Sequence, residues 1–260
     1  MMTETRVTVS LRGRIAVLTM QDAQHHNALG PEQVDALLQG LRQSGDKGAR
    51  AIVIVSADKH FCAGADIRAL LNGDLLDARR PPPPNAPMML FRALVDDPRP
   101  VILGIDGLAM GGGTEMTLVA DLVLATERAR FRLPELGLGV LPRTALARLP
   151  EIVGRRKAME LILTRRMFDA HEAHAMGLVN RLVAPETLLD TAVAVAEEIV
   201  AAPPAALAAA KQSLGRVDPA DWQAMHEMLG LMDPEEWREG FTAFLEKRNP
   251  EYDRFWAGRD

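Results

Sequence analysis

The chain has 260 residues, of which 48% are hydrophobic and 25% are charged. This composition is that of a globular protein long enough to form one large domain. The formal net charge is -5 and the sequence pI is about 5.7, so the composition does not indicate a basic surface for nucleic acid. Cys62 is the only cysteine, which excludes an intramolecular disulfide and a cysteine-based metal site.

The N-terminal residues MMTETRVTVS have neither the apolar core of a signal peptide nor a transit-peptide pattern. The sequence also lacks an uninterrupted apolar run of about 18 residues, the length that a membrane-spanning helix requires. We therefore expect a cytoplasmic protein with no membrane partner and no nucleic-acid partner.

The first half of the chain alternates between strand-like and helix-like patterns. Apolar and polar residues alternate around Gly13 through the first 20 residues, which predicts a short β-hairpin. Apolar residues at helical spacing predict a helix that begins at Pro31. Continuous apolar runs then predict strands at 51–55, 101–105 and 122–125. Helix-length segments separate these runs, and this alternation predicts an α/β fold.

The second half of the chain is predicted to be mostly helical. Before that half begins, Pro81 to Pro84 predict a stiff surface loop that belongs to the α/β core. From about residue 142, alanine-rich helical segments dominate, and one further strand is predicted at 178–181. We expect residues 1–195 to form the α/β core and residues 196–260 to form a helical C-terminal region.

The last predicted helix has a well-marked start. Asp233 is its predicted N-cap, Pro234 takes the first helical position, and Glu236 completes a start that resembles a capping box. Four apolar residues share one face of this helix, and we expect that face to pack on the core or on another subunit: Trp237, Phe241, Phe244 and Leu245.

Two glycine-containing segments each follow a predicted strand and open a predicted helix. The first is KHFCAGADI at 59–67, and the second is GLAMGGGTE at 107–115. Free backbone N–H groups at the start of a helix bind anionic oxygen, and two such amides form an oxyanion hole for a thioester carbonyl. The alternative is that both are ordinary structural turns. The second segment does not have the G-x-G-x-x-G spacing of a dinucleotide site.

Two carboxylates follow these turns. Glu115 comes directly after the glycine triplet, and Glu135 lies in the segment FRLPELGLG at 131–139. Paired carboxyl groups with raised pKa values act as acid and base on one substrate. Each residue taken alone is more often a solvated helix residue, so the pattern by itself leaves both interpretations open.

The three segments, in their order and spacing, resemble the enoyl-CoA hydratase/isomerase (crotonase) superfamily. The similarity starts at Asn27-Ala28-Leu29 and continues through MELILT at 159–164 to the tail from Glu239 to Arg248, so it covers nearly the whole chain. It implies an α/β fold of the crotonase type, a spiral of ββα repeats with a helical C-terminal region that builds trimers or dimers of trimers.

The resemblance also implies a function and a set of site residues. The function is hydration of a 2-enoyl-CoA, with Glu115 on the attacking water and Glu135 exchanging the proton at Cα. The amides of Ala65 and Gly112 would hold the thioester oxygen. Further residues would bind coenzyme A along with these two, namely Ala63, Asp66, Ile67, Arg68 and Lys247. Coenzyme A would be part of the substrate, so neither a separate cofactor nor a metal is expected.

One segment departs from the family pattern. Hydratases usually carry a glycine-rich loop of the form P-G-A-G-G-T after the second glutamate, whereas this chain has PRTALAR at 142–148, without glycine. That loop borders the water site, so an arginine in this segment, which contains Arg143 and Arg148, could reshape the site or contact substrate. Two alternatives to a hydratase therefore stay open: a 3,2-enoyl-CoA isomerase, in which one carboxylate moves a proton, and a non-catalytic acyl-CoA-binding protein with the same fold.

Several other residues have two possible interpretations. His171 and His174 lack the H-E-x-x-H spacing of a zinc site and are predicted to be surface residues. Cys62 has no evident base beside it and is predicted to be a small buried thiol. The segment 88–91 is predicted either to line an acyl pocket or to pack in the core.

Overall fold

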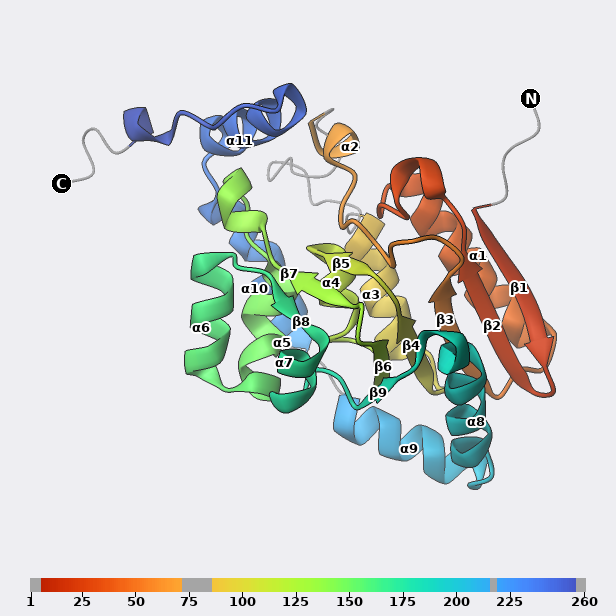
Figure 1. Ribbon diagram of the computed structural model, residues 1–260. Coiled ribbons are helices and arrows are strands. Elements are labelled where there is room, and N and C mark those ends of the chain that lie inside the picture. Colours follow the sequence, from red (N-terminus) through yellow and green to blue (C-terminus); the bar gives the residue numbers. More distant parts are fainter. Residues whose placement is uncertain (1–5, 72–85, 216–218, 256–260) are drawn as a thin grey trace.

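The structure is a computed structural model that describes residues 6–71, 86–215 and 219–255. The proline segment at 81–84 lies outside the described residues, so the predicted stiff loop stays a prediction. The element order along the chain can be followed by colour in Figure 1.

A six-stranded sheet forms the centre of the fold (Figure 1), with the strand order β1-β2-β3-β4-β6-β9. β1 and β2 form the predicted antiparallel hairpin, and every other neighbouring pair is parallel. The continuous apolar runs predicted as strands are confirmed as β3, β4 and β6, whose residues are almost all buried. The strands of this sheet are β1 (Val7–Arg12), β2 (Ile15–Met20), β3 (Ala51–Ser56), β4 (Val101–Ile105), β6 (Leu122–Thr126) and β9 (Arg181–Val183).

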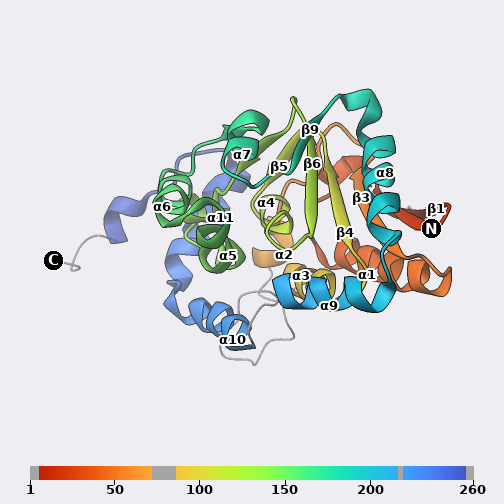
Figure 2. The same ribbon diagram turned by 90° about the horizontal axis from the view of Figure 1, so that it is seen from below.

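Helices cover both faces of this sheet because successive strand residues point to opposite sides. Leu18 and Ile54 pack on one face with α1 (Pro31–Asp46) and α3 (Ala86–Asp96). Val17 and Val53 pack on the other face with α8 (Leu188–Val200). Figure 2 shows these helices around the sheet from below. This two-sided burial explains why the strands are continuously apolar instead of alternating.

A second, three-stranded sheet was not predicted. Its strands, in the order β5-β7-β8, are β5 (Leu108–Met110), β7 (Arg130–Arg132) and β8 (Phe168–Asp169). Two isolated bridges, Cys62 with Ala109 and Leu29 with Ala65, hold the first glycine-containing turn to the β5 segment and to the turn before α1. The predicted strand at 178–181 is wrong in position, because the amides of Leu178 and Val179 bond to Ala173 O and close a helix instead.

The region after residue 142 is mostly helical, as predicted. The predicted domain boundary after residue 195 falls inside α8 and stays a prediction. The remaining α-helices are α2 (Ile67–Leu71), α4 (Gly112–Met116), α5 (Arg143–Val153), α6 (Arg155–Thr164), α7 (Ala170–Ala175), α9 (Pro204–Gly215), α10 (Pro219–Glu227) and α11 (Pro234–Glu246). The 3₁₀ turns are η1 (Ala23–His25), η2 (Glu135–Leu138), η3 (Pro185–Thr187), η4 (Met228–Leu231) and η5 (Tyr252–Phe255).

The helix α11 begins as predicted, with the Asp233 side chain accepting a hydrogen bond from the Glu235 amide. Trp237 and Phe241 are buried and pack in a small apolar cluster with Leu70 of α2. The other two residues of the predicted face, Phe244 and Leu245, are 54% and 41% exposed on this chain. The helix therefore covers α2 and η2, two of the elements that carry the predicted site.

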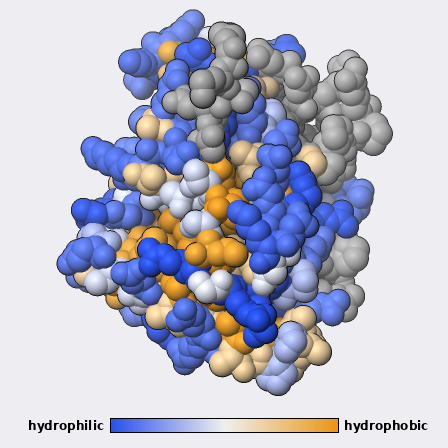
Figure 3. Space-filling view, turned by 90° about the vertical axis from the view of Figure 1, so that its right-hand side faces the viewer, coloured by the Kyte–Doolittle hydropathy of each residue, from blue (hydrophilic) through white to orange (hydrophobic). Residues whose placement is uncertain are grey.

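The surface on the side of β1 carries apolar residues (Figure 3). They gather in a central patch that hydrophilic residues surround. No single helix in the described part of the chain is both long and apolar enough to cross a membrane. One bent pair, Pro185–Val200 with Pro204–Gly215 at 109°, meets the length and composition criteria together, and α8 in that pair packs on the central sheet.

Candidate active site

Both glycine-containing turns and both predicted carboxylates meet at one cavity of about 80 Å³. The cavity lies where α2, α3, α4, η2 and the start of α5 converge. Its wall is mostly apolar and includes three charged side chains. The lining residues are Ala65, Leu70, Pro87, Met88, Phe91, Gly112, Glu115, Glu135, Val140, Leu141, Arg143, Thr144 and Met232.

Two backbone amides lie side by side on the wall of this cavity. A Cβ atom placed on Gly112 would be 3.7 Å from the amide nitrogen of Ala65, so the two turns are in close contact. Neither the Ala65 amide nor the Gly112 amide has a hydrogen-bond acceptor among the described residues. Two unsatisfied N–H groups that face one cavity form a site for a carbonyl oxygen that becomes negatively charged during a reaction.

The close approach of these turns depends on backbone contacts. Gly64 has φ +96°, and a Cβ atom there would lie 2.8 Å from the carbonyl oxygen of Met110. The buried side chain of Asn27 also holds the first turn in place, since its amide nitrogen donates to Phe61 O at 3.1 Å and to Ser56 Oγ at 2.9 Å. The sequence showed that Asn27 begins the segment that resembles the family, but it did not reveal that the Asn27 side chain holds this turn in place.

Glu135 is the first residue of η2 and points into the cavity. Its Oε2 atom is fully buried and has no hydrogen-bond partner among the described residues. Burial and then the nearby Glu115 raise the pKa of Glu135 well above its usual value. A Cβ atom on Gly111 would lie 2.6 Å from Glu135 Oε1, so glycine at position 111 makes room for this carboxyl group.

Glu115, on α4, is the second carboxyl group of the cavity. It is 9% exposed, and its Oε1 atom accepts a hydrogen bond of 2.9 Å from the Ala145 amide. Burial raises the pKa of Glu115, while the amides of Ala145 and Thr144 and the charge of Arg143 oppose that rise. For Glu135 only its own backbone amide opposes the rise, while the charge of Glu115 adds to it, so the two carboxyl groups differ in their tendency to ionise. A pair of this kind can act as base and acid on one substrate.

Known proteins resemble this chain over nearly its whole length. A protein-family model described as enoyl-CoA hydratase/isomerase matches residues 11–254, which is nearly the whole chain. This chain belongs to the enoyl-CoA hydratase/isomerase family. It has the crotonase fold, as its structural relatives do, so the predicted family and fold class are confirmed.

Curated and solved relatives in this family match the chain over most of its length. A probable enoyl-CoA hydratase of Rhizobium meliloti is 34% identical and covers 94% of this chain and 96% of its own. A short-chain-enoyl-CoA hydratase of Clostridium acetobutylicum is 32% identical, with coverages of 94% and 96%. The crystal structure of carnitinyl-CoA hydratase from Mycobacterium avium is 32% identical, with a TM-score of 0.80 and coverages of 97% and 100%.

The predicted coenzyme A contacts of this crotonase-fold chain lie outside the cavity wall, apart from Ala65 and Gly112. Asp66 caps α2, since its Oδ1 accepts from the Arg68 amide at 2.9 Å and from the Ala69 amide at 3.3 Å. Ala63 and Ile67 are half-buried, and the Arg68 side chain is exposed. Lys247 is exposed at the end of α11 with φ +55°. The coenzyme A roles of these residues stay predictions.

The segment 142–148 was predicted as a loop and is instead the start of α5 in this crotonase-fold chain. Pro142 is its N-cap, and the amides of Thr144 and Ala145 bond the Glu115 carboxylate. The sequence therefore missed both amides as site groups. The available signal was Pro142 followed by residues at helical spacing up to Gly154.

The two uncertain sequence signals, Cys62 and the histidines, are structural. Burial raises the pKa of the Cys62 thiol to about 12, and its Sγ atom donates to Asn27 O at 3.2 Å. His174 Nδ1 lies 2.8 Å from Val179 O, while His171 is exposed. Within the described residues, no group of three or more His, Cys, Asp or Glu side chains is placed to hold a metal ion.

The segment 88–91 combines both predicted roles. Met88 and Phe91 line the cavity, whereas Leu90 is fully buried in the core and Met89 is 39% exposed. The helix α3 therefore contributes to the cavity wall and to the core beneath it.

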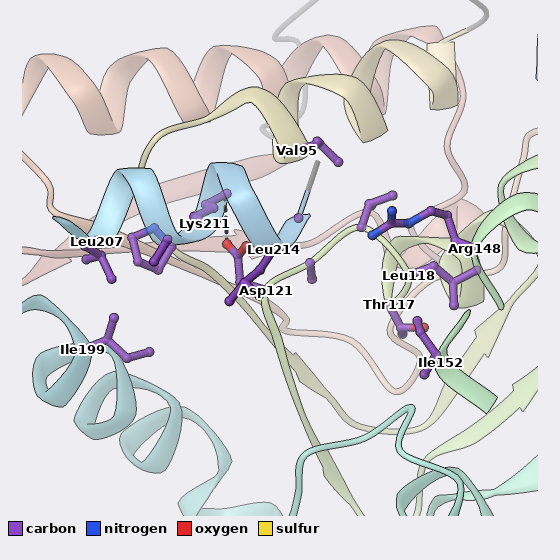
Figure 4. A pocket seen from close by; sticks show the side chains of 15 residues that line it. Val95, Thr117, Leu118, Asp121, Arg148, Ile152, Ile199, Leu207, Lys211 and Leu214 are labelled. Carbon is purple, nitrogen blue, oxygen red and sulfur yellow. Dashed lines mark ion pairs between the residues drawn. The ribbon is translucent and has the colours of Figure 1, made fainter. Parts of the chain in front are cut away.

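A larger cavity of about 330 Å³ lies between α5, α9 and the segment before β6 (Figure 4). Two of the charged residues that line it, Lys211 and Asp121, pair with each other. Lys211 Nζ forms an ion pair of 2.8 Å with Asp121 and donates to the carbonyl oxygens of Leu94 and Arg99. The Lys211–Asp121 ion pair holds α9 against the core. Because these two charges are paired with each other, we expect catalysis at the smaller cavity, which Glu115 and Glu135 line.

Proposed function

We propose that this chain is an enoyl-CoA hydratase, which adds water across the double bond of a 2-enoyl-CoA to give a 3-hydroxyacyl-CoA. The observation that carries the proposal is the meeting of two free amides and two carboxyl groups of unequal environment in one cavity. The names of the hydratase relatives support it. Coenzyme A is part of the substrate, so the proposal requires no separate cofactor.

In the proposed reaction, the thioester oxygen accepts hydrogen bonds from the amides of Ala65 and Gly112. These amides withdraw electron density from the double bond and stabilise the enolate that forms when it is attacked. Each oxyanion-hole donor typically contributes about 3–4 kcal/mol of transition-state stabilisation. Because both donors are backbone groups of fixed turns, they are oriented before the substrate binds.

The two carboxyl groups divide the proton transfers. Ionised Glu115 removes a proton from water as the water oxygen bonds to C3, and the electron pair of the double bond moves toward the thioester oxygen. Protonated Glu135 then delivers its proton to C2. One proton passes from Glu115 to Glu135 to complete the cycle. The higher pKa of Glu135, which burial and Glu115 cause, keeps it in the protonated form that this step requires.

The test is loss of the enoyl-thioester absorbance of crotonyl-CoA, with mass spectrometry to detect the addition of one water. We expect Glu115→Gln and Glu135→Gln each to lower turnover by about 100- to 10,000-fold, the usual contribution of a general acid or base. Glu127→Gln is the control, because the Glu127 side chain is 74% exposed and its ion pair, 3.8 Å from His171, is on the surface. Hydration at the wild-type rate in either site variant would remove that residue from the mechanism.

The same assay separates the alternative functions. A 3,2-enoyl-CoA isomerase would move the double bond of a 3-enoyl-CoA without a change in mass. The unpartnered Oε2 atom of Glu135 suits such a proton shuttle, which keeps this candidate open. A non-catalytic acyl-CoA-binding protein would bind the thioester and leave its mass and its absorbance unchanged.

We also propose that the chain assembles as a trimer or as a dimer of trimers through its helical C-terminal region. Exposed apolar residues on that region support the proposal, since a large apolar side chain in water is often covered by a partner. Phe244 is 54% exposed, Leu231 78% and Leu214 87%. Light scattering on the purified protein measures the assembly directly, and a monomer would contradict it.

A further inference from the structure

Arg143 lines the same cavity as Glu115 and Glu135, and its side chain makes few hydrogen bonds to the described residues. Its Nη1 atom donates to Met225 O at 3.2 Å, and this is its only hydrogen bond among the described residues. No ion pair involves Arg143 in that part of the chain either. A guanidinium group has five N–H donors, so most of them have no acceptor among the described residues.

A half-buried arginine without an ion-pair partner in the described part of the chain requires an explanation. Burial of a charge is unfavourable unless an opposite charge or hydrogen bonds compensate for it. The charge of Glu115 acts on Arg143, but the amides of Ala145 and Thr144 bond the Glu115 carboxylate, and the described residues show no ion pair between the two side chains. The guanidinium group therefore has space in front of it that a ligand can enter.

We propose that Arg143 binds a carboxylate on the acyl chain, so that the preferred substrates are short enoyl-CoA thioesters with a terminal carboxylate. This inference rests on the proposed function and names its substrate class. Arginine suits the role because its planar group binds a carboxylate through two parallel hydrogen bonds. The thioester oxygen would lie at the Ala65 and Gly112 amides, and the free carboxylate would lie at Arg143.

The size and charge of the cavity agree with this assignment. Its volume of about 80 Å³ is several times the roughly 10–15 Å³ that one water requires on this measure, so the cavity fits a short acyl group. A second carboxylate beside Glu115 and Glu135 would be repelled if both were ionised. Arg143 supplies the positive charge that offsets this repulsion, and a protonated Glu135 adds none.

The test compares two five-carbon substrates that differ only in the terminal group. Glutaconyl-CoA ends in a carboxylate, and 2-pentenoyl-CoA ends in a methyl group. The measured quantity is the ratio of kcat/KM between them, so a general loss of activity in a variant cancels. For the wild type we expect glutaconyl-CoA to be favoured. In Arg143→Met we expect this ratio to fall by about 10- to 100-fold, the usual effect of losing charged hydrogen bonds.

Two further variants make the result interpretable. Arg143→Lys keeps the charge but loses the planar pair of donors, and we expect an intermediate ratio. Arg156→Met is the matched control, because Arg156 is exposed on α6, and we expect the wild-type ratio. The same kcat/KM ratio in the wild type and in Arg143→Met would overturn the inference. If that unchanged ratio comes with an equal loss of activity on both substrates, the role of Arg143 is to support Glu115.

Failure of this inference can be distinguished from failure of the proposed function. If neither substrate is hydrated, the proposed function fails, and calorimetry then measures the binding of each thioester directly. Tighter binding of glutaconyl-CoA that is lost in Arg143→Met would support the carboxylate site without any reaction. Equal affinities for the two thioesters in the wild type would overturn it.

Discussion

At the scale of single residues, the Glu135 carboxyl group links function to stability. Burial raises its pKa well above the usual 4.5, so the folded protein keeps this proton at pH values where the unfolded chain has lost it. The folded state then binds more protons than the unfolded state, and the free energy of unfolding falls as pH rises from about 4.5 toward the folded pKa. The environment that keeps Glu135 protonated for catalysis therefore lowers the free energy of unfolding above pH 4.5, where the unfolded chain ionises freely.

The Glu135→Gln variant tests this linkage. Glutamine has the same shape but does not ionise, so we expect the variant to be more stable than the wild type near pH 8 and to lose less stability between about pH 5 and pH 8. Urea unfolding across this range measures the free energy. Glu127→Gln is the exposed control and should follow the wild-type curve. Parallel curves for Glu135→Gln and the wild type would mean that Glu135 titrates normally in the folded protein.

At the scale of elements, the short helix α4 depends on the glycine at its start. Gly111 has φ +49° and ψ -120°, a sparsely populated conformation that costs other residues about 1–3 kcal/mol, and a Cβ atom there would meet Glu135 Oε1. Gly154 also has a positive φ, +78°, but nothing lies within 4 Å of its Cβ position. Both glycines therefore hold backbone conformations that other residues rarely adopt, although their ψ angles differ (-120° and 149°), and only Gly111 contacts the acid.

This difference gives a matched pair of variants. We expect Gly111→Ala and Gly154→Ala each to lose about 1–3 kcal/mol of stability from the backbone, with a further loss for Gly111→Ala from the contact with Glu135. Only Gly111→Ala should lower kcat, because the new methyl group displaces Glu135 from the cavity. Urea unfolding and the crotonyl-CoA assay measure the two effects. Similar kcat values in both variants would show that Glu135 tolerates the methyl group where it stands.

The elements also show how far the sequence predicts the structure. β3, β4 and β6 were predictable because burial on both faces makes each a continuous apolar run. β5, β7 and β8 have two or three residues each, too few for a pattern to emerge. The apolar pair Leu178 and Val179 resembled a strand, but Gly177 turns the chain with φ +86°. The amides of Leu178 and Val179 then bond to Ala173 O in α7.

At the scale of the whole molecule, the cavity gathers residues from distant parts of the chain. The motifs pointed to Ala65, Gly112, Glu115 and Glu135, since each stands in a segment that resembles the family. Sequence patterns could not show that these four meet, nor that Arg143 joins them, because the meeting depends on how the two sheets are joined. Cys62 lies at that junction, through its bridge to Ala109 and its contact with Gly113.

The single cysteine therefore reports on the integrity of the junction. Cys62 is fully buried and its pKa is raised to about 12, so its thiol should react with a disulfide reagent only after the structure opens. We expect native labelling to be about 1,000-fold slower or more than labelling in urea, and to speed up with urea in step with global unfolding. Ser213→Cys adds an exposed thiol as the control, which should react at once. Fast labelling of Cys62 without urea would mean that the two sheets separate locally, and the paired amides of Ala65 and Gly112 would then not be fixed before substrate binds.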